Sequence, residues 1–178
     1  MSSERIFIIG FMFSGKSSYG INLAKEMGCA FVDTDDLLVK QEGMPVAEMF
    51  EKYGQEWFRE KEKEVLRSLL SLNNVVIATG GGTPIYSDNM TWMLNNGTVV
   101  YLHIDAEDII ERIQNSETLA SRPLLKNSST DDIKRMLSER VPIYERAHIT
   151  VSGLSFNAGT VEQAIITAWN TQSSLTNK

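Results

Sequence analysis

The sequence has a single cysteine, Cys29, and only two histidines among its 178 residues. One cysteine excludes an internal disulfide, and the sequence has no cluster of Cys and His with the spacing of a zinc site. Cys29 opens a short apolar run, so we interpret it as a small buried side chain rather than a nucleophile. The fold must therefore be held by its hydrophobic core alone, which a chain of this length can supply.

Positive charge is also scarce, because 17 lysines and arginines stand against 23 acidic residues and leave a net charge of −6. Such a chain has no general electrostatic reason to bind nucleic acid or an anionic membrane, so any anion site must be a local basic cluster. No apolar run approaches the roughly 20 residues that cross a bilayer. No basic leader precedes the first predicted strand. These features predict a cytoplasmic protein that binds neither nucleic acid nor membranes.

Strand and helix patterns alternate along the whole chain. Short apolar runs predict strands at 5–9, 29–32, 74–79, 98–104 and 148–151, and amphipathic stretches predict helices at 16–27, 36–42, 45–72, 88–95, 106–115, 130–144 and 159–170. Asp36, Ser87 and Thr130 are predicted as residues that cap three of these helices. The alternation predicts one α/β domain with a mostly parallel sheet and helices on both faces.

The segment 10–17 reads Gly-Phe-Met-Phe-Ser-Gly-Lys-Ser and matches the phosphate-binding pattern G-x-x-x-x-G-K-[ST]. A predicted strand ends just before it and a predicted helix follows, which is the context that the pattern requires. Backbone N–H groups in such a loop point at phosphate oxygens, Lys16 adds charge for the β- and γ-phosphates, and the Ser17 hydroxyl suits Mg²⁺. The sequence therefore predicts a site for a nucleoside triphosphate.

Acids and glycines follow two other predicted strands. Asp33 and Asp35 come directly after strand 29–32, at the strand end where open α/β sheets bind ligands. One carboxylate near Mg²⁺ and another near an acceptor hydroxyl is what a kinase needs. Three consecutive glycines, 80–82, follow strand 74–79 and allow a ligand to approach bare backbone. No acid follows that strand, so the magnesium role falls to Asp33 or to water.

The segment 115–129 is rich in Ser and Asn, and such a connection is typical of a mobile lid that excludes water from phosphoryl transfer. Arg122 lies within it beside an apolar anchor, which favours a functional role over an idle loop. Most other arginines are, taken singly, more typical of solvated surface charges. Arg59 belongs to a run of alternating charge, a pattern that usually marks an exposed helix face.

Taken together, these motifs resemble those of shikimate kinases, in order and over almost the whole chain. The matching motifs are the phosphate-binding segment 10–17, Asp33-x-Asp35, Phe58-Arg59-x-x-Glu62, Gly80-Gly81-Gly82, Arg122-Pro123-Leu124-Leu125 and Arg140-x-x-x-Tyr144. The first is shared by very many nucleotide-binding proteins, whereas the last four in this order are specific to the family.

The resemblance implies a three-layer α/β/α fold of the nucleoside-monophosphate-kinase type, with a five-stranded parallel sheet of order 2-3-1-4-5. It implies a single kinase domain over 1–178, with a substrate-binding helical region at about 33–62 and a lid at about 115–129. The implied reaction transfers the γ-phosphoryl group of ATP to the 3-hydroxyl of shikimate, in the pathway to chorismate and the aromatic amino acids. We expect a monomer whose partners are the small molecules ATP and shikimate, with Mg²⁺ as cofactor.

The resemblance also implies roles for residues that match the family's motifs. Arg59 and Arg140 would clamp the carboxylate of shikimate, a task that suits a planar guanidinium. Gly81 and Gly82 would contact the ring hydroxyls. Asp35 would hold and deprotonate the attacking hydroxyl, and it is thus both a catalytic and a substrate-binding residue.

On the ATP side, Lys16 and Arg122 would neutralise charge on the moving phosphoryl group, as an arginine finger does. Ser17 would be a direct Mg²⁺ ligand and Asp33 would bind the ion through water. Arg112 would lie near the adenine. The predicted ATP-binding residues are Phe13, Ser14, Gly15, Lys16, Ser17, Ser18, Arg112, Arg122 and Asn157.

Phe13 departs from the family, which usually has glycine at this position of the loop. Two alternatives stay open from the sequence. One is another small-metabolite kinase of the same fold, such as a gluconate-type kinase. The other is a non-catalytic ATP-binding regulatory module, which only Phe13 favours.

Overall fold

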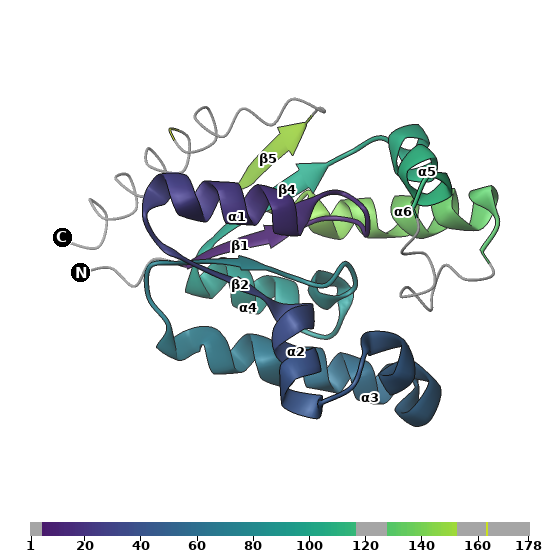
Figure 1. The fold of residues 1–178 in the computed structure, drawn as a ribbon. Helices are drawn as coiled ribbons and strands as arrows, with labels where there is room; N and C mark the ends of the chain where they lie inside the picture. The colour runs from purple at the N-terminus through teal and green to yellow at the C-terminus, as the bar shows by residue number, and fades with distance from the viewer. Residues whose placement is uncertain (1–4, 117–127, 153–162, 164–178) are drawn as a thin grey trace.

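The computed structural model describes residues 5–116, 128–152 and 163. Its five strands form one parallel sheet in the order β2-β3-β1-β4-β5, as the family resemblance implies. The strands are β1 (Arg5–Ile9), β2 (Ala30–Asp33), β3 (Val75–Ala78), β4 (Thr98–His103) and β5 (Ile149–Ser152). All arrowheads in Figure 1 point the same way, so the carboxyl ends of the strands share one edge of the sheet.

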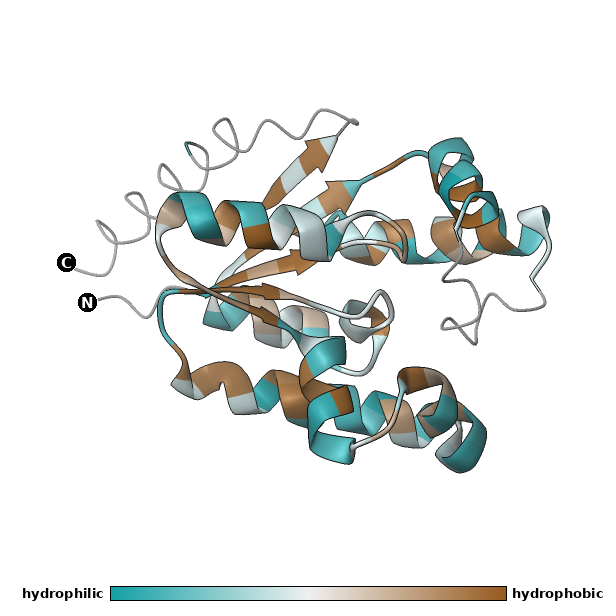
Figure 2. Cartoon of the chain, in the orientation of Figure 1, coloured by the Kyte–Doolittle hydropathy of each residue, from teal (hydrophilic) through white to brown (hydrophobic). Residues whose placement is uncertain are grey.

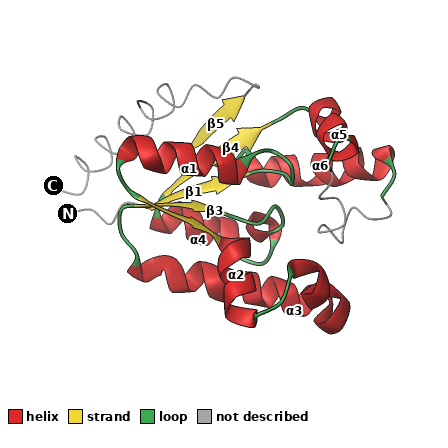
Figure 3. Cartoon of the chain, viewed as in Figure 1, coloured by secondary structure: helices red, strands yellow, loops and turns green. Residues whose placement is uncertain are grey.

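Helices connect the strands and cover the sheet, as Figure 3 shows. They are α1 (Lys16–Met27), α2 (Thr34–Glu42), α3 (Val46–Ser68), α4 (Asn89–Asn96), α5 (Ala106–Gln114) and α6 (Thr130–Tyr144), with short 3-10 turns η1 (Leu69–Ser71) and η2 (Thr83–Ile85). The helix predicted at 45–72 is thus α3 followed by η1. It is interrupted at Gly54, where φ is 81°. The helix predicted at 159–170 lies outside the described residues apart from residue 163.

Alternating side chains of the strands build a core on each face of the sheet. In β1, Ile6 and Ile8 pack with α1, for example against Leu23. Phe7 and Ile9 belong to the larger cluster on the opposite face, which α3, α4, α5 and α6 complete. Figure 2 shows the strands as largely hydrophobic ribbons between helices with hydrophilic outer turns. The predicted three-layer arrangement is therefore confirmed.

The predicted helix caps were wrong by one to three residues. Asp33 caps α2, because its carboxylate accepts a hydrogen bond from the Asp35 N–H at 2.9 Å. Asp36 cannot serve as the cap since it already lies within the helix, whereas Asp33 ends a strand and has the extended backbone that an N-cap requires. For α6 the cap is Ser129 and not Thr130, and for α4 the N-cap position is Asp88 and not Ser87.

Cys29 is partly buried against the α1-side cluster, and burial raises the pKa of its thiol, in accord with a packing role. Across the described ranges, none of the helices combines the length and apolar character that crossing a membrane demands.

Candidate active site

The phosphate loop, residues 10–17, leaves the carboxyl end of β1 and enters α1. Two of its glycines have positive φ, 148° at Gly10 and 89° at Gly15. Gly10 also has no room for a side chain, because a Cβ there would lie 2.8 Å from the carbonyl oxygen of Leu102. No side chain in the described part of the molecule caps the N-terminus of α1. Its first N–H groups are therefore available to an anion, and the helix dipole favours negative charge there.

Hydrogen bonds fix the polar side chains at the end of this loop. The Lys16 ammonium donates to the Phe11 carbonyl at 2.8 Å and so lies across the loop. The Ser17 hydroxyl donates to one carboxylate oxygen of Asp33 at 2.5 Å, and the other oxygen of Asp33 caps α2. The loop after β1 therefore meets the acid that ends β2 at the sheet edge, as the sequence predicts.

These residues line an open pocket, here called the phosphate pocket. Its lining includes the predicted site residues Phe13, Gly15, Lys16, Ser17, Ser18, Asp33, Asp35 and Gly81. Ser14 does not line it, because this residue is fully buried beneath the loop, where its N–H donates to the Phe11 carbonyl.

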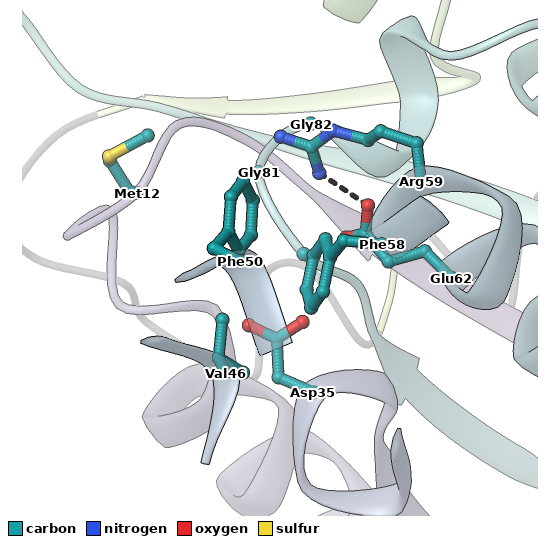
Figure 4. A pocket seen from close by; sticks show the side chains of 10 residues that line it. Met12, Asp35, Val46, Phe50, Phe58, Arg59, Glu62, Gly81 and Gly82 are labelled. Carbon is teal, nitrogen blue, oxygen red and sulfur yellow. Dashed lines mark hydrogen bonds and ion pairs between the residues drawn. The ribbon is translucent and has the colours of Figure 1, made fainter. Parts of the chain in front are cut away.

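A second pocket, here called the inner pocket, lies between the phosphate loop, α2, α3 and the glycine loop of residues 80–82 (Figure 4). Asp35, Arg59, Gly81 and Gly82 are the predicted substrate-binding residues that line it, and Phe50, Phe58 and Val46 form an apolar wall. The two pockets share Met12, Asp35, Gly80 and Gly81. A molecule in the inner pocket therefore lies next to whatever occupies the phosphate pocket, with Asp35 at the junction.

Arg59 corrects one expectation from the sequence, since it is only 8% exposed rather than part of a solvated face. Its guanidinium forms a buried ion pair with Glu62 one turn along α3. It also lies 5.6 Å from the ring of Phe58 and 6.0 Å from that of Phe50. Charges that alternate along the chain do not share one helix face, because a helix repeats every 3.6 residues. Arg59 and Glu62, which are three residues apart, face the protein interior, whereas the charged residues beside them face solvent.

Glu62 is a residue whose role the sequence analysis missed, although it stands in the motif Phe58-Arg59-x-x-Glu62. It is 2% exposed, pairs with Arg59 and accepts a hydrogen bond from the Thr83 hydroxyl at 2.8 Å. Burial raises the pKa of its carboxyl, the nearby Asp35 raises it further, and Arg59 opposes both. Its position three residues after Arg59, about one helical turn away, was the sequence feature that could have indicated the ion pair. A buried acid of this kind orients the guanidinium and leaves its remaining N–H groups for a ligand.

Glycine is required in this loop because a side chain would clash with neighbouring groups. The lack of side chains also lets a ligand reach the backbone. A Cβ at Gly82 would run into the Arg59 guanidinium, and one at Gly80 would run into the Glu62 carboxylate. The Gly80 N–H donates to the Thr34 hydroxyl at 3.2 Å, and the Gly81 carbonyl accepts a hydrogen bond from the Tyr144 hydroxyl at 2.6 Å. The loop therefore lies directly against the charged groups of the inner pocket.

The remaining predicted arginines have different surroundings. Arg140, on α6, lies 5.3 Å above the ring of Phe11, and its buried Nη1 finds no hydrogen-bond partner among the described residues. Arg140 lowers the pKa of the Tyr144 hydroxyl through its charge and a side-chain hydrogen bond, and the charge of Arg59 lowers it too, against the larger effect of burial. Arg112 donates to the Phe13 carbonyl at 2.9 Å and so contacts the phosphate loop.

Arg122 and Asn157 lie outside the described residues, as does 117–127 of the predicted lid at 115–129. Their assignments stay predictions. Oxygen donors suitable for Mg²⁺ are present at Ser17 and Asp33.

Comparison with known proteins gives a consistent result. A family model described as shikimate kinase matches residues 12–168. A protein from Clostridium botulinum (strain Okra / Type B1) named shikimate kinase is 38% identical over 159 residues, covering 89% of this chain and 93% of the relative. A shikimate kinase from Aquifex aeolicus (strain VF5) is 42% identical over 149 residues, with 84% and 86% covered. The solved structure of shikimate kinase from Acinetobacter baumannii in complex with shikimate matches with a TM-score of 0.83 and 32% identity, covering 98% of this chain and 94% of that one.

Proposed function

The chain belongs to the shikimate kinase family, and from that premise we propose how its residues divide the reaction. The enzyme transfers the γ-phosphoryl group of ATP to the 3-hydroxyl of shikimate. The observation that carries the division of roles is the junction at Asp35, where the phosphate pocket meets the inner pocket. ATP occupies the first pocket and shikimate the second.

The acceptor is held by its carboxylate and its hydroxyls. Arg59 and Arg140 grip the carboxylate, and the buried, unsatisfied Nη1 of Arg140 supports this assignment. An acidic protein needs such a local pair of cations to bind an anionic substrate. Gly81 and Gly82 contact the ring hydroxyls with their backbone, since the absence of side chains brings the ring close.

Asp35 acts as the general base toward the attacking hydroxyl. It stands in the first turn of α2, where its backbone N–H donates to the Asp33 carboxylate that caps the helix. Its carboxylate lines both pockets, so it can accept the hydroxyl proton while the oxygen attacks the phosphorus. General bases of this kind contribute about 10²- to 10⁴-fold to turnover.

The donor side supplies charge and position rather than covalent chemistry. The phosphate loop binds the β- and γ-phosphates with its N–H groups, and Lys16 and Arg122 neutralise the charge that moves during transfer. Ser17 and Asp33, which lie within 2.5 Å of each other, are the residues that would hold Mg²⁺, Ser17 directly and Asp33 through water. The ion would supply further charge neutralisation on the phosphates. Arg112 and Asn157 are assigned to the adenine side.

One chain suffices for this scheme, because residues of the same chain line both pockets. We therefore propose that the enzyme works as a monomeric single domain. Its use of ATP favours the cytoplasm as its compartment. The lid at about 115–129 brings Arg122 to the phosphates when it closes.

The role of Asp35 is tested by Asp35→Asn, with Asp131→Asn as the matched control, because Asp131 is an exposed acid in the first turn of α6 that lines neither pocket. We expect Asp35→Asn to lower kcat by at least about 100-fold and to change the Kd for ATP by less than about twofold, because it removes a proton acceptor and no phosphate contact. Asp131→Asn should keep kcat within about threefold of wild type. Steady-state kinetics and nucleotide titration measure both quantities. Equal losses of turnover and ATP binding would contradict the assignment.

A further inference from the structure

Tyr144 is a fully buried side chain at the end of α6 that touches the substrate-binding machinery. Its hydroxyl donates to the Gly81 carbonyl at 2.6 Å, and its ring packs against that of Tyr101 with 5.2 Å between centroids. Burial raises the pKa of the phenol to about 12. The group is therefore a neutral hydrogen-bond donor throughout the range in which the enzyme works.

The position of α6 matters because Arg140 stands one turn before Tyr144, on the same face of the helix. Between them lies Pro142, which has no N–H and so removes one hydrogen bond from this turn of α6. The backbone alone holds this part of the helix less firmly than an uninterrupted turn would. A side-chain anchor at Tyr144 compensates for the missing bond at the turn that carries Arg140.

The anchor ends on the glycine loop, which is itself fixed to the other half of the site. The Gly80 N–H donates to Thr34, the residue before Asp35, and a Cβ at Gly82 would collide with Arg59. The bond from Tyr144 to Gly81 thus ties the helix of Arg140 to the loop that packs on Arg59.

We propose that Tyr144 is a positioning residue, whose hydroxyl holds α6 against the glycine loop so that Arg140 and Arg59 face one substrate carboxylate. This inference rests on the proposed function, because it takes Arg140 and Arg59 as the carboxylate clamp. Tyr144 itself does not touch the reacting atoms.

The test is Tyr144→Phe, which removes only the hydroxyl, with Tyr101→Phe as the matched control. Tyr101 is the neighbouring buried ring, and within the described ranges it forms no hydrogen bond to the glycine loop. We expect Tyr144→Phe to raise the KM for shikimate by about 3- to 10-fold, as the loss of one buried hydrogen bond predicts. Both kcat and the KM for ATP should stay within about twofold. Tyr101→Phe should leave the KM for shikimate unchanged.

A purely structural role would lower the melting temperature without separating the two KM values, and that result would overturn the inference. The variant Arg140→Ala distinguishes a failure of this inference from a failure of the proposed function. If Arg140→Ala leaves the KM for shikimate unchanged, the carboxylate clamp is wrong and the inference falls with it. If Arg140→Ala raises that KM while Tyr144→Phe does not, the inference alone is wrong.

The double variant adds a direct measure of coupling. If Tyr144 acts through Arg140, then combining Tyr144→Phe with Arg140→Ala raises the KM for shikimate no further than Arg140→Ala alone. Multiplied effects of the two changes would overturn the inference, because they would mean independent contributions.

Discussion

Phe13 lies in the phosphate loop with φ at 63°, in the left-handed region that glycine adopts readily and other residues avoid. A non-glycine residue there raises the energy of the folded state by about 1 to 2 kcal/mol. Two contacts offset this strain: the Arg112 guanidinium donates to the Phe13 carbonyl at 2.9 Å, and the side chain packs against the main core. Phe13 is the unusual residue of the loop by sequence, and the positive φ gives the physical reason why glycine suits this position.

Paired substitutions at this position isolate the backbone strain. Both Phe13→Gly and Phe13→Ala remove the ring, so they differ only in the Cβ. We expect the Gly variant to have the higher free energy of unfolding, by about 1 kcal/mol, because glycine accepts a positive φ. Urea denaturation measures the difference.

The control pair is Ile21→Gly and Ile21→Ala on α1, where Ile21 is 51% exposed. There Ala should be the more stable by about 1 kcal/mol, as in any helix interior. If the Ala variant had the higher free energy of unfolding at both positions, that result would contradict backbone strain at Phe13.

At the scale of elements, α3 shows what charge patterning alone does not reveal. Its alternating charges include the exposed pair of Lys61 and Glu64, 2.7 Å apart, and the buried pair of Arg59 and Glu62. A single sequence does not distinguish the two, because burial depends on how the helix is rotated against the glycine loop. The apolar neighbour Phe58, which is buried, was the local sign of the inward face.

The start of β5 carries a pH-sensitive contact. The strand was predicted from residue 148, but it begins at Ile149, and His148 instead accepts a hydrogen bond from the Val99 N–H on β4 through its Nδ1, at 3.0 Å. Partial burial lowers the pKa of His148 below its usual value. The unfolded chain therefore gains a proton first as the pH falls below about 6.5. Below that pH the contribution of His148 to stability is progressively lost.

The variant His148→Asn keeps an acceptor but does not titrate. We expect the free energy of unfolding of the wild type to fall more than that of the variant between about pH 7.5 and pH 5. The difference should be below about 1 kcal/mol, because the ring is partly exposed to solvent that screens it. Denaturant titrations at the two pH values measure it. A variant that responds to acid as strongly as the wild type would contradict a role for His148.

At the scale of the whole molecule, the fold and half of the site follow from sequence. Because β2, β3 and β1 are adjacent and parallel, the phosphate loop, the acids at the junction of β2 and α2 and the glycines after β3 meet at one edge. Local patterns contain this information. The proposed partnership of Arg59, on α3, with Arg140, on α6, depends instead on tertiary packing between distant elements, which no spacing in a single sequence reports.

The predictions of the helix caps were wrong for a related reason. Asp33, Asp36 and the residues around Ser129 all suit a cap by type, and only the backbone conformation selects between neighbours. The alternatives weighed from the sequence, a gluconate-type kinase and a non-catalytic module, lose their support, since a shikimate kinase model matches residues 12–168.

The central claim is shikimate-dependent phosphoryl transfer from ATP, and ADP release tests it most directly. A coupled assay would compare shikimate, gluconate and a nucleoside monophosphate as acceptors for the purified protein with Mg²⁺ and ATP. We predict saturable ADP release with shikimate and only background hydrolysis with the other two, because the proposed clamp of Arg59 and Arg140 and the glycine loop suit a carboxylate on a hydroxylated ring. Release that does not depend on shikimate, or equal release with gluconate, would contradict the account.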